Sequence, residues 1–287
     1  MKKILLIAII ALTTNFAFAQ TTDDGKDIKN VRFGIKITPS LDWYKPDGKI
    51  LAGNGVAPKI GGGLIIEFRL AKVASVCTGL QIDMAGGKIH YNNGGQTTAN
   101  ANTVSYYYSN SDDKILPFNS SPGSDTSGSY NFYKANTRYQ LNDRTYSVSY
   151  ITIPLTLKLK TKQIGMMTYF GQIGINSSIR WKAKANDVVS NWNTNANTSF
   201  TKVDITKDIA PIHETLNIGF GTEMNISGST SLTFGLNYLL GFTNTVKGTS
   251  DYLMKQTNNS SGTGYSLDGL PQNLKSNSVV LTVGVLF

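Results

Sequence analysis

Apolar and polar residues alternate with a period of two in several separate stretches of this chain. In the clearest stretch, residues 151–160, isoleucine and leucine at odd positions alternate with threonine, proline and lysine at even positions. Such alternation places the two kinds of side chain on opposite faces of a β-strand. An aliphatic face opposite a polar face is typical of a strand that has lipid on one side and the lumen of a barrel on the other.

The same alternation, in stronger or weaker form, recurs along the rest of the chain. It covers residues 33–37, 64–70, 76–84, 169–181, 216–226, 232–242 and 279–287. We therefore predict about eight strands, an even number of the kind found in single-chain bacterial barrels.

The connections between these stretches alternate between short and long. Short ones lie near residues 71–74, 161–165 and 227–229, and long ones span residues 41–58, 92–143, 183–208 and 244–275. Short periplasmic turns and long extracellular loops are typical of outer-membrane barrels. We predict an all-β, antiparallel, up-and-down transmembrane barrel with both termini in the periplasm.

The long connections are rich in asparagine, serine, threonine, glycine and tyrosine, and we find no core-forming pattern in them. Loops longer than about 12–15 residues are usually functional or mobile. Residues 92–143 are therefore the leading candidate for an outward-facing interaction surface.

The first residues have the three parts of a secretory signal. Lys2 and Lys3 precede an apolar run over residues 4–12, and an Ala-Phe-Ala sequence ends at Ala19. We predict a signal peptide over residues 1–19, a short periplasmic segment over 20–30 and the barrel over 31–287. No later stretch reaches the length of a membrane-spanning helix, and the mean hydropathy of −0.15 is compatible with spanning strands.

Charge and cysteine content narrow the functional classes. The net charge of +9 falls to +7 without Lys2 and Lys3, and no basic run of the kind that marks a nucleic-acid surface is present. A soluble surface is the favoured interpretation of this modest charge, and contact with anionic head groups or lipopolysaccharide phosphates is the alternative. Outer-membrane lipid and lipopolysaccharide are expected partners because of the predicted location of the barrel. The single cysteine, Cys77, cannot form an intramolecular disulfide, and with only two histidines the chain has no metal-ligand spacing. We expect no metal and no cofactor.

Charged residues of both signs fall on the faces opposite the aliphatic ones. Because the interior of an eight-stranded barrel is only wide enough for side chains, these groups must pair with one another. We predict an ionic network that closes the lumen; a selectivity lining for a narrow channel is the alternative. The expected members are Arg32, Lys36, Glu67, Arg69, Asp83, Lys158, Arg180 and Glu223, and Lys182 is also placed on the inward face.

The two histidines, His90 and His213, are the candidates for acid–base chemistry. Both are placed at the outer ends of strands, near loops that carry Asp112, Asp113, Asp208 and Glu214. No spacing motif accompanies either histidine. We expect a protein that is not an enzyme, and an outer-leaflet enzyme remains the second alternative.

The chain resembles the PorT-like outer-membrane β-barrel family of Bacteroidota. The resemblance rests on an aromatic residue followed by Ile-Pro-Leu-x-Leu-Lys, here carried by Tyr150, Ile153, Pro154, Leu155 and Lys158. Supporting matches are residues 33–36, 169–174 and 219–223, Tyr238 and Phe287. Pro154 lacks a ladder donor and should mark an irregular pairing.

The resemblance implies an outer-membrane location and a barrel, with Phe287 as an insertion cue read by the barrel-insertion machinery. It implies no single activity. Our first hypothesis is a structural or interaction protein of the cell envelope that serves adhesion, envelope integrity or secretion through its extracellular loops. An extracellular or envelope protein that binds these loops is the partner considered.

Overall fold

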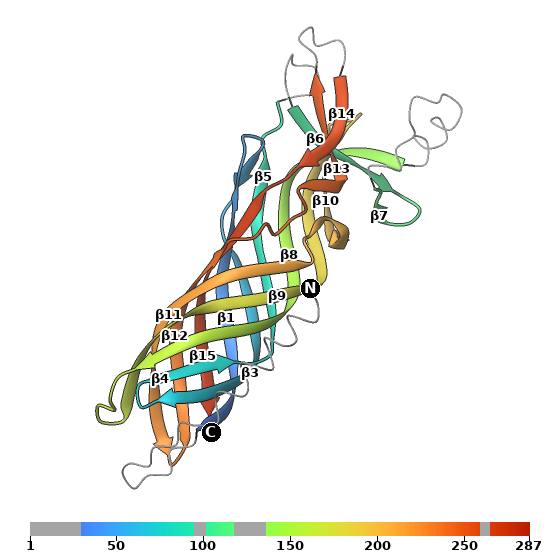
Figure 1. The fold of residues 1–287 in the computed structure, drawn as a ribbon. Coiled ribbons are helices and arrows are strands. Elements are labelled where there is room, and N and C mark those ends of the chain that lie inside the picture. The colour runs from blue at the N-terminus through green and yellow to red at the C-terminus, as the bar shows by residue number, and fades with distance from the viewer. Residues whose placement is uncertain (1–29, 95–101, 118–135, 259–264) are drawn as a thin grey trace, which may run out of the picture.

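The computed structural model describes residues 30–94, 102–117, 136–258 and 265–287, which form one large antiparallel sheet (Figure 1). No described helix is long and apolar enough to cross a membrane. The strands are β1 (Val31–Pro46), β2 (Leu51–Gly53), β3 (Ala57–Ala71), β4 (Ala74–Thr78), β5 (Gln81–Tyr91), β6 (Asn102–Ser109), β7 (Lys114–Ile115), β8 (Asn136–Lys160), β9 (Met167–Asn191), β10 (Asn197–Asp204), β11 (Ile212–Ser227), β12 (Thr230–Gly241), β13 (Thr249–Asn258), β14 (Tyr265–Pro271) and β15 (Leu274–Leu286), with one 3-10 turn, η3 (Thr206–Asp208).

Among the described residues, eight strand positions close into a ring, which confirms the predicted barrel. The order is β1, β3, the pair β4 and β5, β8, β9, β11, β12 and β15. Strands β4 and β5 share one position because both pair with β3 and with β8. Strand β15 closes the ring by pairing with β12 on one side and with β1 on the other.

The shared position of β4 and β5 contains a break at Gly79. This residue has φ +156°, and a Cβ there would lie 2.0 Å from the carbonyl oxygen of Leu64, so only glycine fits. Pro154 of β8 lies opposite the break and has a partner only on β9, where it pairs with Asn176. The missing N–H of the proline therefore costs no hydrogen bond of the ladder.

The short turns lie where the sequence pattern predicts them, between β3 and β4, β8 and β9, and β11 and β12. The C-terminus lies at the same end (Figure 1). Phe287 exchanges two backbone hydrogen bonds with Phe33 near the start of β1, so both ends of the described barrel meet there. The predicted signal peptide and almost all of residues 20–30 lie outside the described residues.

Two zones with opposite polarity follow one another along the barrel. In the first, which we call the aliphatic belt, apolar side chains point outward: Leu155 of β8 is 62% exposed, while Thr156 beside it is buried. Beyond Tyr150 the polarity reverses, because Tyr146, Val148 and Tyr150 are buried inside the sheet and the intervening residues are polar. An aliphatic exterior fits lipid, and a polar exterior around an apolar interior fits water.

We call the second zone the head. It comprises η3, residues 86–91 of β5, 136–150 of β8 and 182–191 of β9, and the strands β2, β6, β7, β10, β13 and β14, most of which lie at the end opposite the C-terminus (Figure 1). The long connections, in which we found no core-forming pattern, do contribute to a core. Their strands enclose a hydrophobic core that includes Leu51, Ile89, Val104, Tyr106, Leu141, Tyr146, Val148, Val189, Ile205, Leu253 and Leu270.

Candidate functional site

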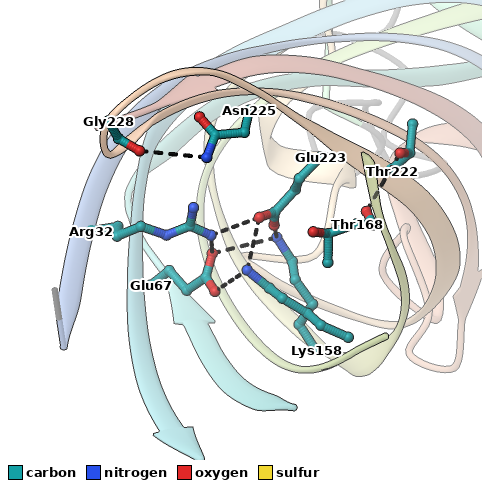
Figure 2. Close-up of polar contacts among 9 residues, drawn as sticks. Arg32, Glu67, Lys158, Thr168, Thr222, Glu223, Asn225 and Gly228 are labelled. Atoms are coloured by element: carbon teal, nitrogen blue, oxygen red, sulfur yellow. Dashed lines mark hydrogen bonds and ion pairs between the residues drawn. The ribbon is translucent and has the colours of Figure 1, made fainter. Parts of the chain in front are cut away.

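Charged side chains of both signs meet inside the turn end of the barrel, and Figure 2 labels four of them, Arg32, Glu67, Lys158 and Glu223. Together with Lys160 they form what we call the ionic cluster. Arg32 Nη2 lies 2.8 Å from Glu67 Oε2 and 2.7 Å from Glu223 Oε2. Lys158 Nζ lies 3.1 Å from Glu223 Oε1 and 3.7 Å from Glu67 Oε2. Lys160 Nζ lies 2.5 Å from Glu67 and 2.9 Å from Glu223. The two carboxylates therefore each contact all three cations.

The sheet register brings these groups together. Arg32 and Glu67 are direct cross-strand partners on β1 and β3, and Lys158 and Lys160 follow each other on the inward face of β8. The carboxylates of Glu67 and Glu223 are only 2% and 5% exposed. Buried charges persist only when they are paired, so three cations around two carboxylates make an interlocked closure at this end of the lumen.

The structure brings together four of the eight predicted network residues, Arg32, Glu67, Lys158 and Glu223. Lys160 completes the cluster, and sequence reasoning left it out of the network. The signal was present, because Lys160 stands two residues after Lys158 on the same polar face of the alternating stretch.

The other four predicted network residues lie elsewhere. Lys36 and Asp83 line the lumen above the cluster, where Asp83 accepts a hydrogen bond from Thr38. Arg69 lies near the turn end of β3 and forms no ion pair with a described residue, and Arg180 donates to the carbonyl of Ile209 at 2.7 Å.

The prediction that Lys182 points inward was wrong. The register between β8 and β9 shifts between Ser149 and Tyr150, and Trp181 is the extra residue on β9. This bulge reverses the order of inward and outward positions, so Ala183 is buried and Lys182 is exposed.

Above the ionic cluster the lumen holds a cavity of about 110 Å³. Its wall carries hydroxyl and amide groups that bond one another: Asn237 Nδ2 donates to Thr282 Oγ1 at 2.9 Å, and Gln172 donates to Asn237. Asn176 and Thr215 also line it. A polar cavity of this size can hold a few water molecules.

The core of the head closes the lumen a second time. Arg144 and Asp187, both fully buried, form a two-fold hydrogen-bonded pair with both distances 2.7 Å. Tyr106 donates to Asp187 at 3.1 Å, and the hydroxyls of Tyr91 and Tyr146 lie 3.0 Å apart. Burial lowers the pKa of Arg144, but the Asp187 carboxylate outweighs it and raises the pKa above its usual value. The pair is therefore a fixed ionic element inside an apolar core.

Sequence reasoning missed this second closure. The signal was the alternation of Arg144, Tyr146, Val148 and Tyr150, which runs directly into the aliphatic stretch but with its apolar residues at even positions. This change of phase marks the transition from a water-facing strand to a lipid-facing strand.

The histidines occupy two different environments. His90 Nδ1 lies 2.9 Å from Asp143 Oδ1 at the exposed surface of the head. His213 is buried, with Nε2 2.8 Å from Ser276 Oγ and Nδ1 3.2 Å from Thr243 Oγ1. The His213 ring therefore contacts a hydroxyl group at each nitrogen. Beside the serine contact, its second nitrogen faces a threonine hydroxyl instead of a carboxylate.

The carboxylates that we expected beside the histidines have other partners. Asp208 accepts from Ser250, Glu214 from Ser177 and Asp113 from Tyr108. In the described part of the chain, no three His, Cys, Asp or Glu side chains are grouped so as to hold a metal ion.

Comparison with solved structures finds outer-membrane proteins. Ail of Yersinia pestis is 12% identical, with 90% of this chain and 100% of that chain covered and a TM-score of 0.32. A major outer membrane protein of Thermus thermophilus is 11% identical, covering 90% and 98%, with a TM-score of 0.36. OprG of Pseudomonas aeruginosa is 9% identical, covering 90% and 97%, with a TM-score of 0.36.

Comparison with curated proteins finds no match. Residues 12–247, most of the sequence, match the family described as outer membrane protein beta-barrel domain. The closed ring, its aliphatic exterior and its polar lumen agree with that match. The chain therefore belongs to the outer membrane protein beta-barrel domain family.

Proposed function

We propose that this protein is a closed outer-membrane barrel that acts as a structural or interaction protein of the cell envelope and presents its head outside the cell. The observation that carries the proposal is the double closure of the lumen, by the ionic cluster at one end and by the head core at the other. A barrel closed twice is suited to hold a structure at the cell surface instead of passing solutes.

The head supports an interaction role because it is a folded surface. Its hydrophobic core and buried Arg144–Asp187 pair fix the relative positions of its strands. Strands β10 and β14 stand at the two ends of the strand order among the described residues, so each offers an edge. Exposed edges can pair with a strand of another chain.

Planar-bilayer recording tests the closure. The purified protein should give no discrete openings under conditions in which a general porin conducts. Reproducible openings would overturn the proposal and favour the narrow channel, for which the polar cavity between the closures is the supporting observation.

Cysteine labelling of intact cells tests the orientation. The only natural cysteine, Cys77, is buried. Asn193→Cys, in the exposed turn between β9 and β10, should react with a membrane-impermeant maleimide, whereas Lys162→Cys, in the turn between β8 and β9, should react only after the outer membrane is permeabilised. The reverse pattern would contradict an outward head and periplasmic termini.

We also propose that the protein acts without catalysing a reaction. Among the described residues, no serine, threonine or cysteine side chain forms a hydrogen bond with His90 or Asp143, and the Ser276–His213 pair is buried against Thr243. An envelope lipid or peptide hydrolysed by wild type but not by His213→Ala would contradict this part of the proposal.

We also propose that the chain is a PorT-like member of the family. Tyr150, Ile153, Pro154, Leu155 and Lys158 support this assignment, because they place an aromatic residue at the edge of the aliphatic belt and a lysine in the ionic cluster. We propose only that the chain is PorT-like, and not that it takes part in secretion.

A further inference from the structure

A basic cleft lies on the outside of the sheet, where the head meets the aliphatic belt. It encloses about 500 Å³ and is lined by Lys59, Thr145, Ser147, Ser149, Lys182, Lys184, Ala185, Asn186 and Lys202. Four of these residues are lysines and none is acidic. Such a charge balance in a concave surface favours an anionic ligand.

Two strands supply the floor of the cleft. Ser149 pairs with Lys182, Ser147 with Lys184 and Thr145 with Asn186, so hydroxyls of β8 stand beside the lysines and the amide of β9. Cross-strand partners share a face of the sheet. The bulge at Trp181 turns Lys182 and Lys184 outward, which is what creates this face.

The other two lysines are directed into the cleft by special backbone features. Lys59 of β3 crosses over Gly86 and donates to Ser147 Oγ at 3.1 Å, and a Cβ at Gly86 would lie 2.6 Å from Lys59 Cε. Lys202 sits in a bulge of β10 with φ 57°, a conformation that lysine rarely adopts. Its N–H donates to Asn186 Oδ1 at 2.8 Å, which holds it there.

None of the four lysines forms an ion pair with a carboxylate of the described residues within 4.0 Å. Asp204 is the cross-strand partner of Lys184, and its Oδ1 accepts the backbone N–H of Thr206 at 2.8 Å. Lys182, Lys184 and Lys202 therefore keep their positive charge available to a ligand, whereas Lys59 also interacts electrostatically with the carboxylate of Asp42.

The position of the cleft identifies the ligand class. Ser149 is followed two residues later, about 7 Å along the strand, by Ile151, the first outward residue of the aliphatic belt on β8. Trp181 and Ile179 mark the same boundary on β9 and are 66% and 58% exposed. Tryptophan is enriched at the membrane–water interface. A ligand in the cleft would thus have its anionic group at headgroup level and apolar surface directly below it.

We propose that this cleft binds the phosphate groups of a membrane lipid whose acyl chains lie against the aliphatic belt. Ammonium groups from three strands and serine and threonine hydroxyls supply the donors that a phosphate accepts. The inference is independent of whether the barrel conducts.

The test measures binding of diphosphorylated lipid A to the full-length protein in phosphatidylcholine nanodiscs. The variant Lys182→Gln/Lys184→Gln/Lys202→Gln should bind lipid A at least about tenfold more weakly than wild type, because it loses three charge-assisted contacts. The matched control is Lys49→Gln/Lys162→Gln/Lys275→Gln, which removes the same charge at exposed positions outside the cleft and should change binding by less than about twofold.

Further arms identify the ligand source. Wild type and the cleft variant should bind dephosphorylated lipid A with equal affinity. Excess inorganic phosphate should leave lipid A largely bound to wild type. An equal loss of lipid A affinity in both triple variants would contradict a specific site in the cleft. Full displacement of lipid A by inorganic phosphate would show that the cleft binds soluble anions and would contradict a lipid as its ligand. Heat-dependent gel migration verifies folding, and single Lys182→Gln and Lys202→Gln variants replace the triple if it does not fold. Nanodiscs expose both faces, so orientation in the cell does not affect the result.

Discussion

Replacing Glu223 by glutamine should destabilise the barrel more than any exposed charge substitution. In the native cluster three cations share two carboxylates, and Glu223 contacts all three cations at 2.7–3.1 Å. The variant leaves Arg32, Lys158 and Lys160 around Glu67 alone. Since the side chain of Glu223 is 5% exposed, water cannot replace the lost charge.

The expected cost is about 3–5 kcal/mol, the range for removing one partner of a buried ion pair. With a urea dependence of about 2 kcal/mol per molar, the unfolding midpoint should fall by about 1.5–2.5 M. Tryptophan fluorescence of the protein in detergent micelles can follow this transition. The control is Glu214→Gln on the same strand, which removes an exposed contact with Ser177 and should cost less than about 0.5 kcal/mol.

A double variant separates charge balance from packing. Adding Lys160→Gln to Glu223→Gln restores a single excess cation, so the two substitutions together should cost at least about 1 kcal/mol less than the sum of the single costs. Additive costs, or a Glu223→Gln midpoint equal to that of Glu214→Gln, would refute the idea that the cluster is held by its charges.

Three further variants test the remaining features. Gly79→Ala should lower the free energy of unfolding, measured by urea titration, by about 1–3 kcal/mol because its Cβ meets the Leu64 carbonyl. Gly171→Ala, where nothing lies within 4 Å of an added Cβ, should not, and equal effects would contradict a requirement for glycine at the break. Arg144→Met should increase hydrogen exchange in the head and leave the belt unchanged, and Asp187→Leu added to it should restore protection; uniform exchange would show that the zones are not independent. Burial raises the pKa of Asp208 above 3.8, so its contribution to stability is complete below that value and is lost as the pH rises through the folded pKa. The stability of wild type relative to Asp208→Asn should therefore increase as the pH falls from 7 toward 4, and a constant difference would contradict this.

The ring of strands could be predicted from the sequence because its signal is local. Each outward aliphatic residue has lipid as its neighbour, whatever strand lies beside it, so a stretch such as residues 151–160 is recognisable alone. The short turns follow from the same stretches. Four of the eight predicted network residues could be identified for the same reason. The period-two alternation places Arg32, Glu67, Lys158 and Glu223 on the inward faces of their strands.

The head was not predictable in the same way. Its core depends on partners that are distant in sequence, as in the pairing of Met254 with Ser105 across β13 and β6. Bulges near Asn142 and Trp181 also change the parity within β8 and β9, which hides a period-two pattern. The basic cleft depends on the second of these bulges and on the bulge of β10, so neither charge nor spacing along the chain could indicate it.

The length of β8 has a consequence for reach. The strand continues for fifteen residues from Ile151 at the edge of the belt back to Asn136, about 50 Å of extended backbone at about 3.3 Å per residue. Even if it is tilted by about 40°, as barrel strands are, its tip stands nearly 40 Å from the lipid boundary. A partner can therefore engage the tip without approaching the bilayer, and shortening β8 and β9 together by whole pairs of residues would lower the contact point while keeping every side chain on its own face.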